Sequence, residues 1–119
     1  MNTLEIQLRS NVISGILAFP KNNLSWVMTK GMSVETAVAL LTEKISNAIL
    51  AVHTEAFAKV PSTLILLGGV AQGLLASPND NLKIAHKAVR KGEKEDMYKK
   101  FASVCVMITK ELINAQSKK

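Results

Sequence analysis

The stretch of sequence that decides the fold is residues 60–79, VPSTLILLGGVAQGLLASPN, which contains no charged residue. Pro61 suits the first turn of a helix, and Pro78 follows the point at which that helix would end. The apolar part is about 13 residues long, which is typical of a buried core helix, whereas spanning a membrane takes roughly 20. Because no second strand-like run exists to pair with residues 63–67, we predict a helix from about Ser62 to Ala76, central and the most buried.

On both sides of this stretch, apolar residues recur every three or four positions. This pattern predicts amphipathic helices over residues 3–18, 34–59 and 94–116. Pro20 ends the first helix, Ser33 suits the N-cap of the second, and Gly92 suits the end of a further basic helix that begins near residue 80. Residues 21–30 form a short helix or a loop that holds Trp26 against the core.

The predicted fold class is therefore all-α. We expect a single domain over residues 1–119, a compact bundle of four to five helices around the central apolar helix, with a tail that frays from about residue 117. Gly69 and Gly73 lie four residues apart on one helix face, where a second backbone can approach closely. Their segment lacks the Lys-Ser/Thr pair of a phosphate-binding P-loop, so we expect a packing role for both glycines.

Composition excludes several classes of protein. A chain of 119 residues has room for one domain, and 48% apolar residues argue against disorder. The single cysteine, Cys105, excludes an intramolecular disulfide framework and a multi-cysteine zinc site. Glu5 and Arg9 interrupt the N-terminal segment, which is unlike a secretory signal. We therefore expect a cytoplasmic protein.

Few residues are suited to catalysis. His53, His86 and Cys105 fall on three different predicted helices, and nucleophilic catalysis needs a nucleophile beside a base. Cys105 lies on the apolar stripe of its helix, which is typical of an inert buried thiol, and both histidines fall on polar arcs, where we expect exposure. Glu55 follows His53 by two residues, which does not suit a helical metal site. We expect no enzymatic activity, no cofactor and no metal.

Charge is unevenly distributed along the chain. The net charge is +6, and residues 1–82 contain five basic and five acidic residues, so the whole excess lies in the last third. On a helical projection, four cations share an arc of about 100° opposite the apolar residues, and Lys94 extends the group. The candidate partner-binding residues are Lys83, Lys87, Arg90, Lys91 and Lys94.

The sequence favours a small intracellular interaction protein (a regulator, an inhibitor, an immunity-type protein or an assembly factor) that binds an acidic partner through this basic helix face. The main alternative is a nucleic-acid-binding protein that uses residues 83–100, although Tyr98 is the only aromatic residue there. A small membrane-associated protein is the second alternative. The apolar seam from Val34 to Ala56 also predicts a homodimer.

Overall fold

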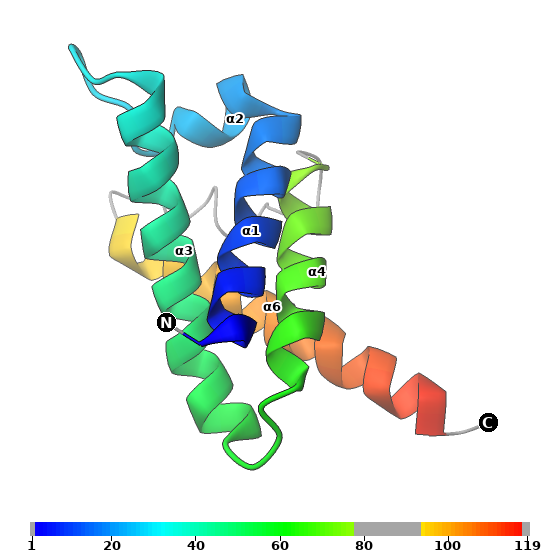
Figure 1. The fold of residues 1–119 in the computed structure, drawn as a ribbon. Coiled ribbons are helices and arrows are strands. Elements are labelled where there is room, and N and C mark those ends of the chain that lie inside the picture. The colour runs from blue at the N-terminus through cyan, green and yellow to red at the C-terminus, as the bar shows by residue number, and fades with distance from the viewer. Residues whose placement is uncertain (1, 78–93, 118–119) are drawn as a thin grey trace.

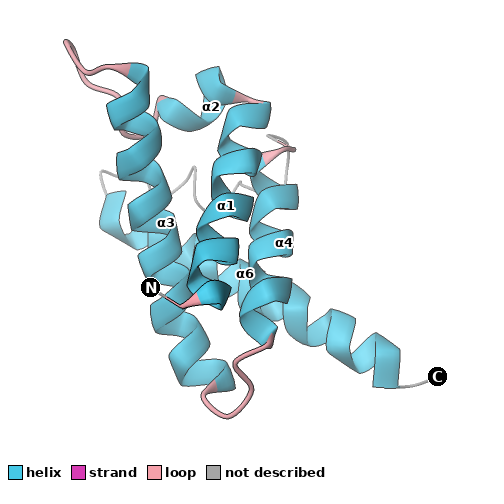
Figure 2. Cartoon of the chain, viewed as in Figure 1, coloured by secondary structure: helices cyan, strands magenta, loops and turns pink. Residues whose placement is uncertain are grey.

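The computed structural model describes residues 2–77 and 94–117, which form five helices and no strand (Figures 1 and 2). The predicted all-α class is confirmed. The basic helix expected near residues 80–92 lies outside the described residues. The helices are α1 (Thr3–Ala18), α2 (Pro20–Leu24), α3 (Val34–Phe57), α4 (Thr63–Leu75) and α6 (Lys94–Ser117).

Local sequence signals explain where these helices begin and end. The side chain of Asn2 accepts a hydrogen bond from the Glu5 N–H at 2.9 Å, and Ser33 accepts one from the Thr36 N–H at 3.1 Å. Both contacts satisfy backbone donors that have no partner inside a helix. Pro20 ends α1 and begins α2. Trp26 follows α2 and is buried, as the sequence predicts.

Helices α1 and α4 run side by side in the same direction (Figure 1). They pack along their length, and a glycine stands at two of the closest approaches. A Cβ atom on Gly15 would lie 2.8 Å from the carbonyl oxygen of Gln72, and one on Gly68 would lie 2.9 Å from Nδ2 of Asn11. At Gly15 the close atoms include the backbone of Gln72, which cannot give way, so the two backbones come this close because glycine stands there. At Gly68 the close atom is the end of the Asn11 side chain, and the nearest backbone atom, the Leu8 Cα, would lie 3.4 Å away.

The prediction that Gly69 and Gly73 carry the close helix contact is wrong. Apart from its chain neighbours and the nearby backbone of its own helix, a Cβ atom on either one would meet no described atom within 4 Å, because this side of α4 faces outward. Ile65 and Leu66 are each 40% exposed on the same helix. Consequently the other described helices do not cover α4 on all sides, and α1 lies between α3 and α4 instead (Figure 1).

Asn23 joins the C-terminal ends of these two helices. It is fully buried, and its Nδ2 group donates to the carbonyl oxygens of Gly15, Ile16 and Leu75 at 3.4, 3.2 and 3.0 Å. The Ile16 carbonyl has no helical donor, since Pro20 stands four residues later and lacks an N–H. Helix C-termini carry partial negative charge, so a donor where two of them meet stabilises the pair.

The remaining helices complete the core. Helix α3 packs against α1 and α6, and α6 crosses behind α1 and α4 (Figures 1 and 2). Leu41, Ile45 and Ile49 of α3 are fully buried within the single chain. The seam from which we predicted a homodimer is therefore largely used inside the chain, so that argument for a dimer no longer holds.

The α1–α4 contact makes a specific prediction about glycines. Gly15→Ala should lower the melting temperature, because its new Cβ meets backbone atoms of α4 and overpacking costs about 1–3 kcal/mol. Gly69→Ala should raise the melting temperature, since the site is open and alanine favours helix by up to about 1 kcal/mol. Thermal unfolding followed by circular dichroism measures both. The opposite order of melting temperatures would contradict this description of the contact.

Candidate functional site

Most of the predicted basic face lies outside the described residues. This applies to Lys83, Lys87, Arg90 and Lys91. Lys94 is the first residue of α6, and its side chain is not described. One end of the candidate site therefore lies at the start of α6.

The structure corrects the predicted exposure of His53. We expected an exposed histidine, but its side chain is only 9% exposed and its Nε2 atom lies 2.8 Å from Oγ1 of Thr63. The Thr63 hydroxyl donates to the Val60 carbonyl oxygen at 2.6 Å, so Nε2 of His53 carries the proton and donates to Thr63. The turn through Pro61 brings the start of α4 back against the end of α3, and His53 links the two. His86 lies outside the described residues.

Cys105 is buried, as the sequence predicts. Burial raises the pKa of its thiol to about 12, because an apolar environment disfavours the thiolate. The thiolate is the nucleophilic form of cysteine. Cys105 therefore fills space in the core and is poorly suited to attack a substrate.

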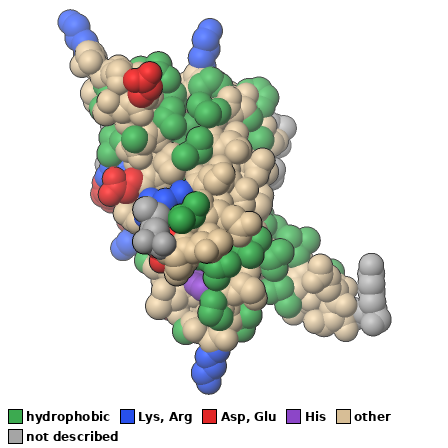
Figure 3. All heavy atoms as spheres, viewed as in Figure 1, with side chains coloured by type: hydrophobic (Ala, Val, Ile, Leu, Met, Phe, Trp, Pro, Cys, Tyr) green, Lys and Arg blue, Asp and Glu red, His purple; other side chains and the backbone are tan. Residues whose placement is uncertain are grey.

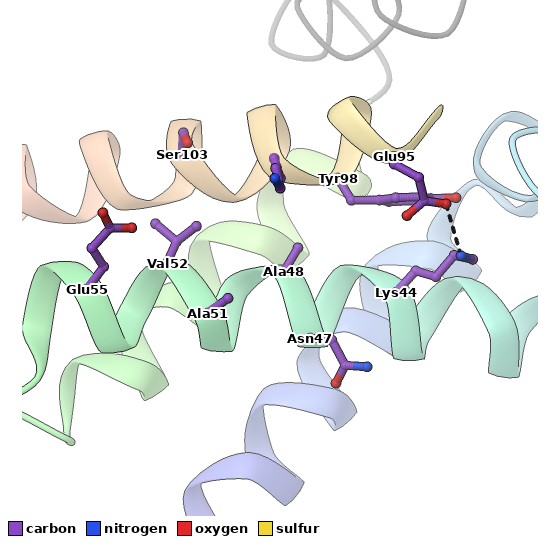
Figure 4. A pocket seen from close by; sticks show the side chains of 10 residues that line it. Lys44, Asn47, Ala48, Ala51, Val52, Glu55, Glu95, Tyr98 and Ser103 are labelled. Carbon is purple, nitrogen blue, oxygen red and sulfur yellow. Dashed lines mark hydrogen bonds and ion pairs between the residues drawn. The ribbon is translucent and has the colours of Figure 1, made fainter. Parts of the chain in front are cut away.

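An open groove of about 600 Å³ lies between α3 and α6. Ala48 and Ala51 of α3 have small side chains, which leave this space between the two helices open (Figure 4). Polar and charged side chains come from both helices. The groove is lined by Lys44, Asn47, Ala48, Ala51, Val52, Glu55, Glu95, Tyr98, Lys99 and Ser103.

One end of the groove is organised around Lys44. Its ammonium group lies 3.3 Å from a carboxylate oxygen of Glu95 and 5.5 Å from the centre of the Tyr98 ring (Figure 4). The Glu95 side chain is 82% exposed, so this ion pair contributes little to stability. Burial raises the pKa of the Tyr98 phenol, and the negative charge of Glu95 raises it further. Tyr98 is therefore a neutral wall of the groove at physiological pH.

The other end of the groove carries Glu55, which reaches from α3 toward α6 (Figure 4). The groove's second carboxylate, Glu95, is paired with Lys44, and Glu55 stands eleven residues after Lys44, or about 16 Å along a helix axis. Carboxylates that share acid and base roles lie closer together, at about 5–9.5 Å. Ser103 supplies an aliphatic hydroxyl to the groove, and the groove lining contains no histidine to activate it. The arrangement is suited to binding a molecule that presents both charges.

The sequence indicates the polar edges of α3 and α6, but it does not reveal that these edges meet. Lys44 and Glu55 sit beside the apolar seam of α3, and Tyr98 and Lys99 sit beside that of α6. Only the tertiary pairing of the two helices turns these residues into one groove.

Two other kinds of site can be considered over residues 2–77 and 94–117. No three His, Cys, Asp or Glu side chains gather there as a metal ion would require. Within the same residues, no helix combines the length and the hydropathy needed to cross a membrane. The sequence matches no family model, no curated protein and no solved structure.

The burial of Cys105 predicts its reactivity. At pH 8 a thiol with a pKa of about 12 is ionised to the order of 1 part in 10,000. A disulfide reagent should therefore modify the folded chain far more slowly than the chain unfolded in guanidinium. As a control, Ser103→Cys in a Cys105→Ser background places the thiol on the exposed side of the same helix and should react fast. Equal rates for folded and unfolded wild type would contradict the assignment.

Proposed function

We propose that this chain acts by binding and not by catalysis. It is a small interaction protein of the cytoplasm, such as a regulator, an inhibitor, an immunity-type protein or an assembly factor. The observation that supports this best is the location of the chemically reactive side chains. His53 is committed to a contact between two helices and Cys105 to the core, while the open groove contains neither.

The partner we propose is an acidic protein, bound through Lys83, Lys87, Arg90, Lys91 and Lys94. The described residues contain nine basic and seven acidic residues, so most of the +6 excess lies outside them. In the first turns of α6, Glu95 and Asp96 offset Lys99 and Lys100, which argues against a uniform basic stripe there. An excess of positive charge on one segment attracts and orients a negatively charged partner.

The groove between α3 and α6 adds a place for such a partner to dock. Lys94 precedes Glu95, a groove residue, by one position in the chain. A partner held by the basic segment at Lys94 is therefore close to the groove end formed by Lys44 and Tyr98. Lysine and tyrosine at this end suit a carboxylate-bearing side chain, since Lys44 can exchange its exposed partner Glu95 for a carboxylate of the ligand.

Charge reversal tests this proposal. In the quadruple variant Lys83→Glu, Lys87→Glu, Arg90→Glu and Lys91→Glu, the net charge changes from +6 to −2. We expect its affinity for poly-glutamate at low salt to fall by roughly tenfold or more, because four attractive contacts become repulsive. Fluorescence anisotropy with labelled poly-glutamate measures the change, and a random DNA duplex of similar length is measured in parallel over a salt series.

A matched control carries the same change in net charge at other exposed lysines: Lys21→Glu, Lys30→Glu, Lys59→Glu and Lys110→Glu. This control should retain most of the binding. If both variants lose affinity equally, the effect is one of net charge and the basic segment is not the site. If the wild type binds the duplex strongly and poly-glutamate weakly, with a steep loss of affinity as salt rises, the partner is a nucleic acid.

A further inference from the structure

The groove between α3 and α6 carries opposite charges on α3 at its two ends. Lys44 lies at one end, 3.3 Å from Glu95, and Glu55 lies at the other (Figure 4). Glu55 is exposed and forms no ion pair with another described residue. All ten residues that line the groove belong to the described part of the chain. A ligand that covers the whole groove therefore meets a cation at one end and an unpaired carboxylate at the other.

Between these two charges, the α3 side of the groove is small and apolar. Ala48 and Val52 are half-buried, Ala51 is exposed, and the buried Tyr98 lines the groove from α6. How closely two helices approach depends on the size of the side chains where they touch. The alanines therefore leave room for a third helix to lie along α3 and α6. Figure 3 shows the charged side chains of the visible face scattered singly or in small groups among apolar and polar ones.

The backbone of the ligand distinguishes a helix from an extended segment. The described residues form no strand, so they offer no sheet edge with which an extended peptide could pair. The backbone groups of α3 and α6 beside the groove are bonded within their own helices. An extended segment would therefore give up hydrogen bonds to water on the side that faces the groove, whereas a helix satisfies its own backbone groups.

We propose that the groove binds an α-helix of the partner protein, which presents a carboxylate to Lys44 and a cation to Glu55. The inference rests on the binding role proposed above and names the element of the partner that docks.

The spacing on α3 predicts the pattern on this helix. Lys44 and Glu55 lie eleven residues apart, and about 11 residues make three helical turns, so a helix that runs along α3 carries its two charges on one face at the same spacing. Apolar residues four and seven positions after the first charge cover Ala48 and Ala51. This spacing reads the same in both directions of the partner helix.

Three alanine-based peptides of about 18 residues test the pattern, because helices of this length form in water. They share the two apolar residues and differ only at the two positions eleven residues apart, which hold one glutamate and one lysine, two glutamates, or two lysines. Fluorescence anisotropy with the full chain, at about 0.15 M salt to screen its net charge, gives the affinities. We expect the wild type to bind the mixed peptide about fivefold more tightly than either of the others.

Single charge reversals should switch this preference. Glu55→Lys should favour the peptide with two glutamates, and Lys44→Glu the peptide with two lysines. Glu43→Lys and Lys30→Glu are matched controls, since both residues are exposed and neither lines the groove. Both controls should keep the preference for the mixed peptide, and circular dichroism confirms that each variant is folded.

The failure of this inference is separate from the failure of the basic segment as a binding site, because these variants leave residues 83–94 unchanged. Equal affinities for the three peptides, no measurable binding of any of them, or a switch in the control variants would overturn the inference, whatever poly-glutamate does. Equal binding of a mixed peptide with a central proline, which breaks the helix, would also overturn it and assign the groove to an extended segment.

Discussion

The parallel contact between α1 and α4 is the constraint on which the rest of the structure depends. Glycine at position 15 lets the two backbones touch near the C-terminal ends of both helices, and Gly68 leaves room for the Asn11 side chain. That arrangement places partial negative charges side by side. Asn23 offsets them with a buried amide that donates to carbonyls of both helices. Helix α3 packs on α1, and helix α6 packs on α4. The positions of α3 and α6 therefore follow from the α1–α4 pair.

The same contact determines which surfaces remain for function. Because α4 uses Gly68 and Ala71 toward the inside, its Ile65, Leu66 and Gly69 point outward. Because α3 and α6 meet along an edge with small residues, a groove with charged walls stays open between them. Among the described residues, the cysteine Cys105 and the histidine His53 are used in the interior. This distribution supports the binding role that we propose.

Helix positions could be predicted from the sequence because their signals are local. Asn2, Ser33 and Pro20 act within one turn of their own helices, and the observed ends lie within about two residues of the expected ones. The side of α4 that meets α1 could not be predicted, since this helix is apolar on nearly every side. Gly68 and Gly69 differ by only 100° of rotation.

The burial of His53 could not be predicted for a related reason. A helical projection of α3 does not include the turn that brings Thr63 back against His53. The groove required knowledge of which helices pair, and periodicity contains no such information.

The stability of Asn23→Asp as a function of pH tests the role of Asn23 at the α1–α4 contact most directly. An ionised carboxylate cannot donate to the three carbonyl oxygens and adds negative charge where two helix C-termini meet. The pKa of this buried carboxyl should therefore rise above its usual value of about 3.9. The folded state then favours the protonated carboxyl. The variant should therefore lose least free energy of unfolding, relative to wild type, below about pH 4. The loss should grow as pH rises through the raised pKa of the folded state. Denaturant unfolding of both proteins over this pH range gives the difference. A variant as stable as the wild type at pH 7, with a difference that does not change with pH, would contradict the account.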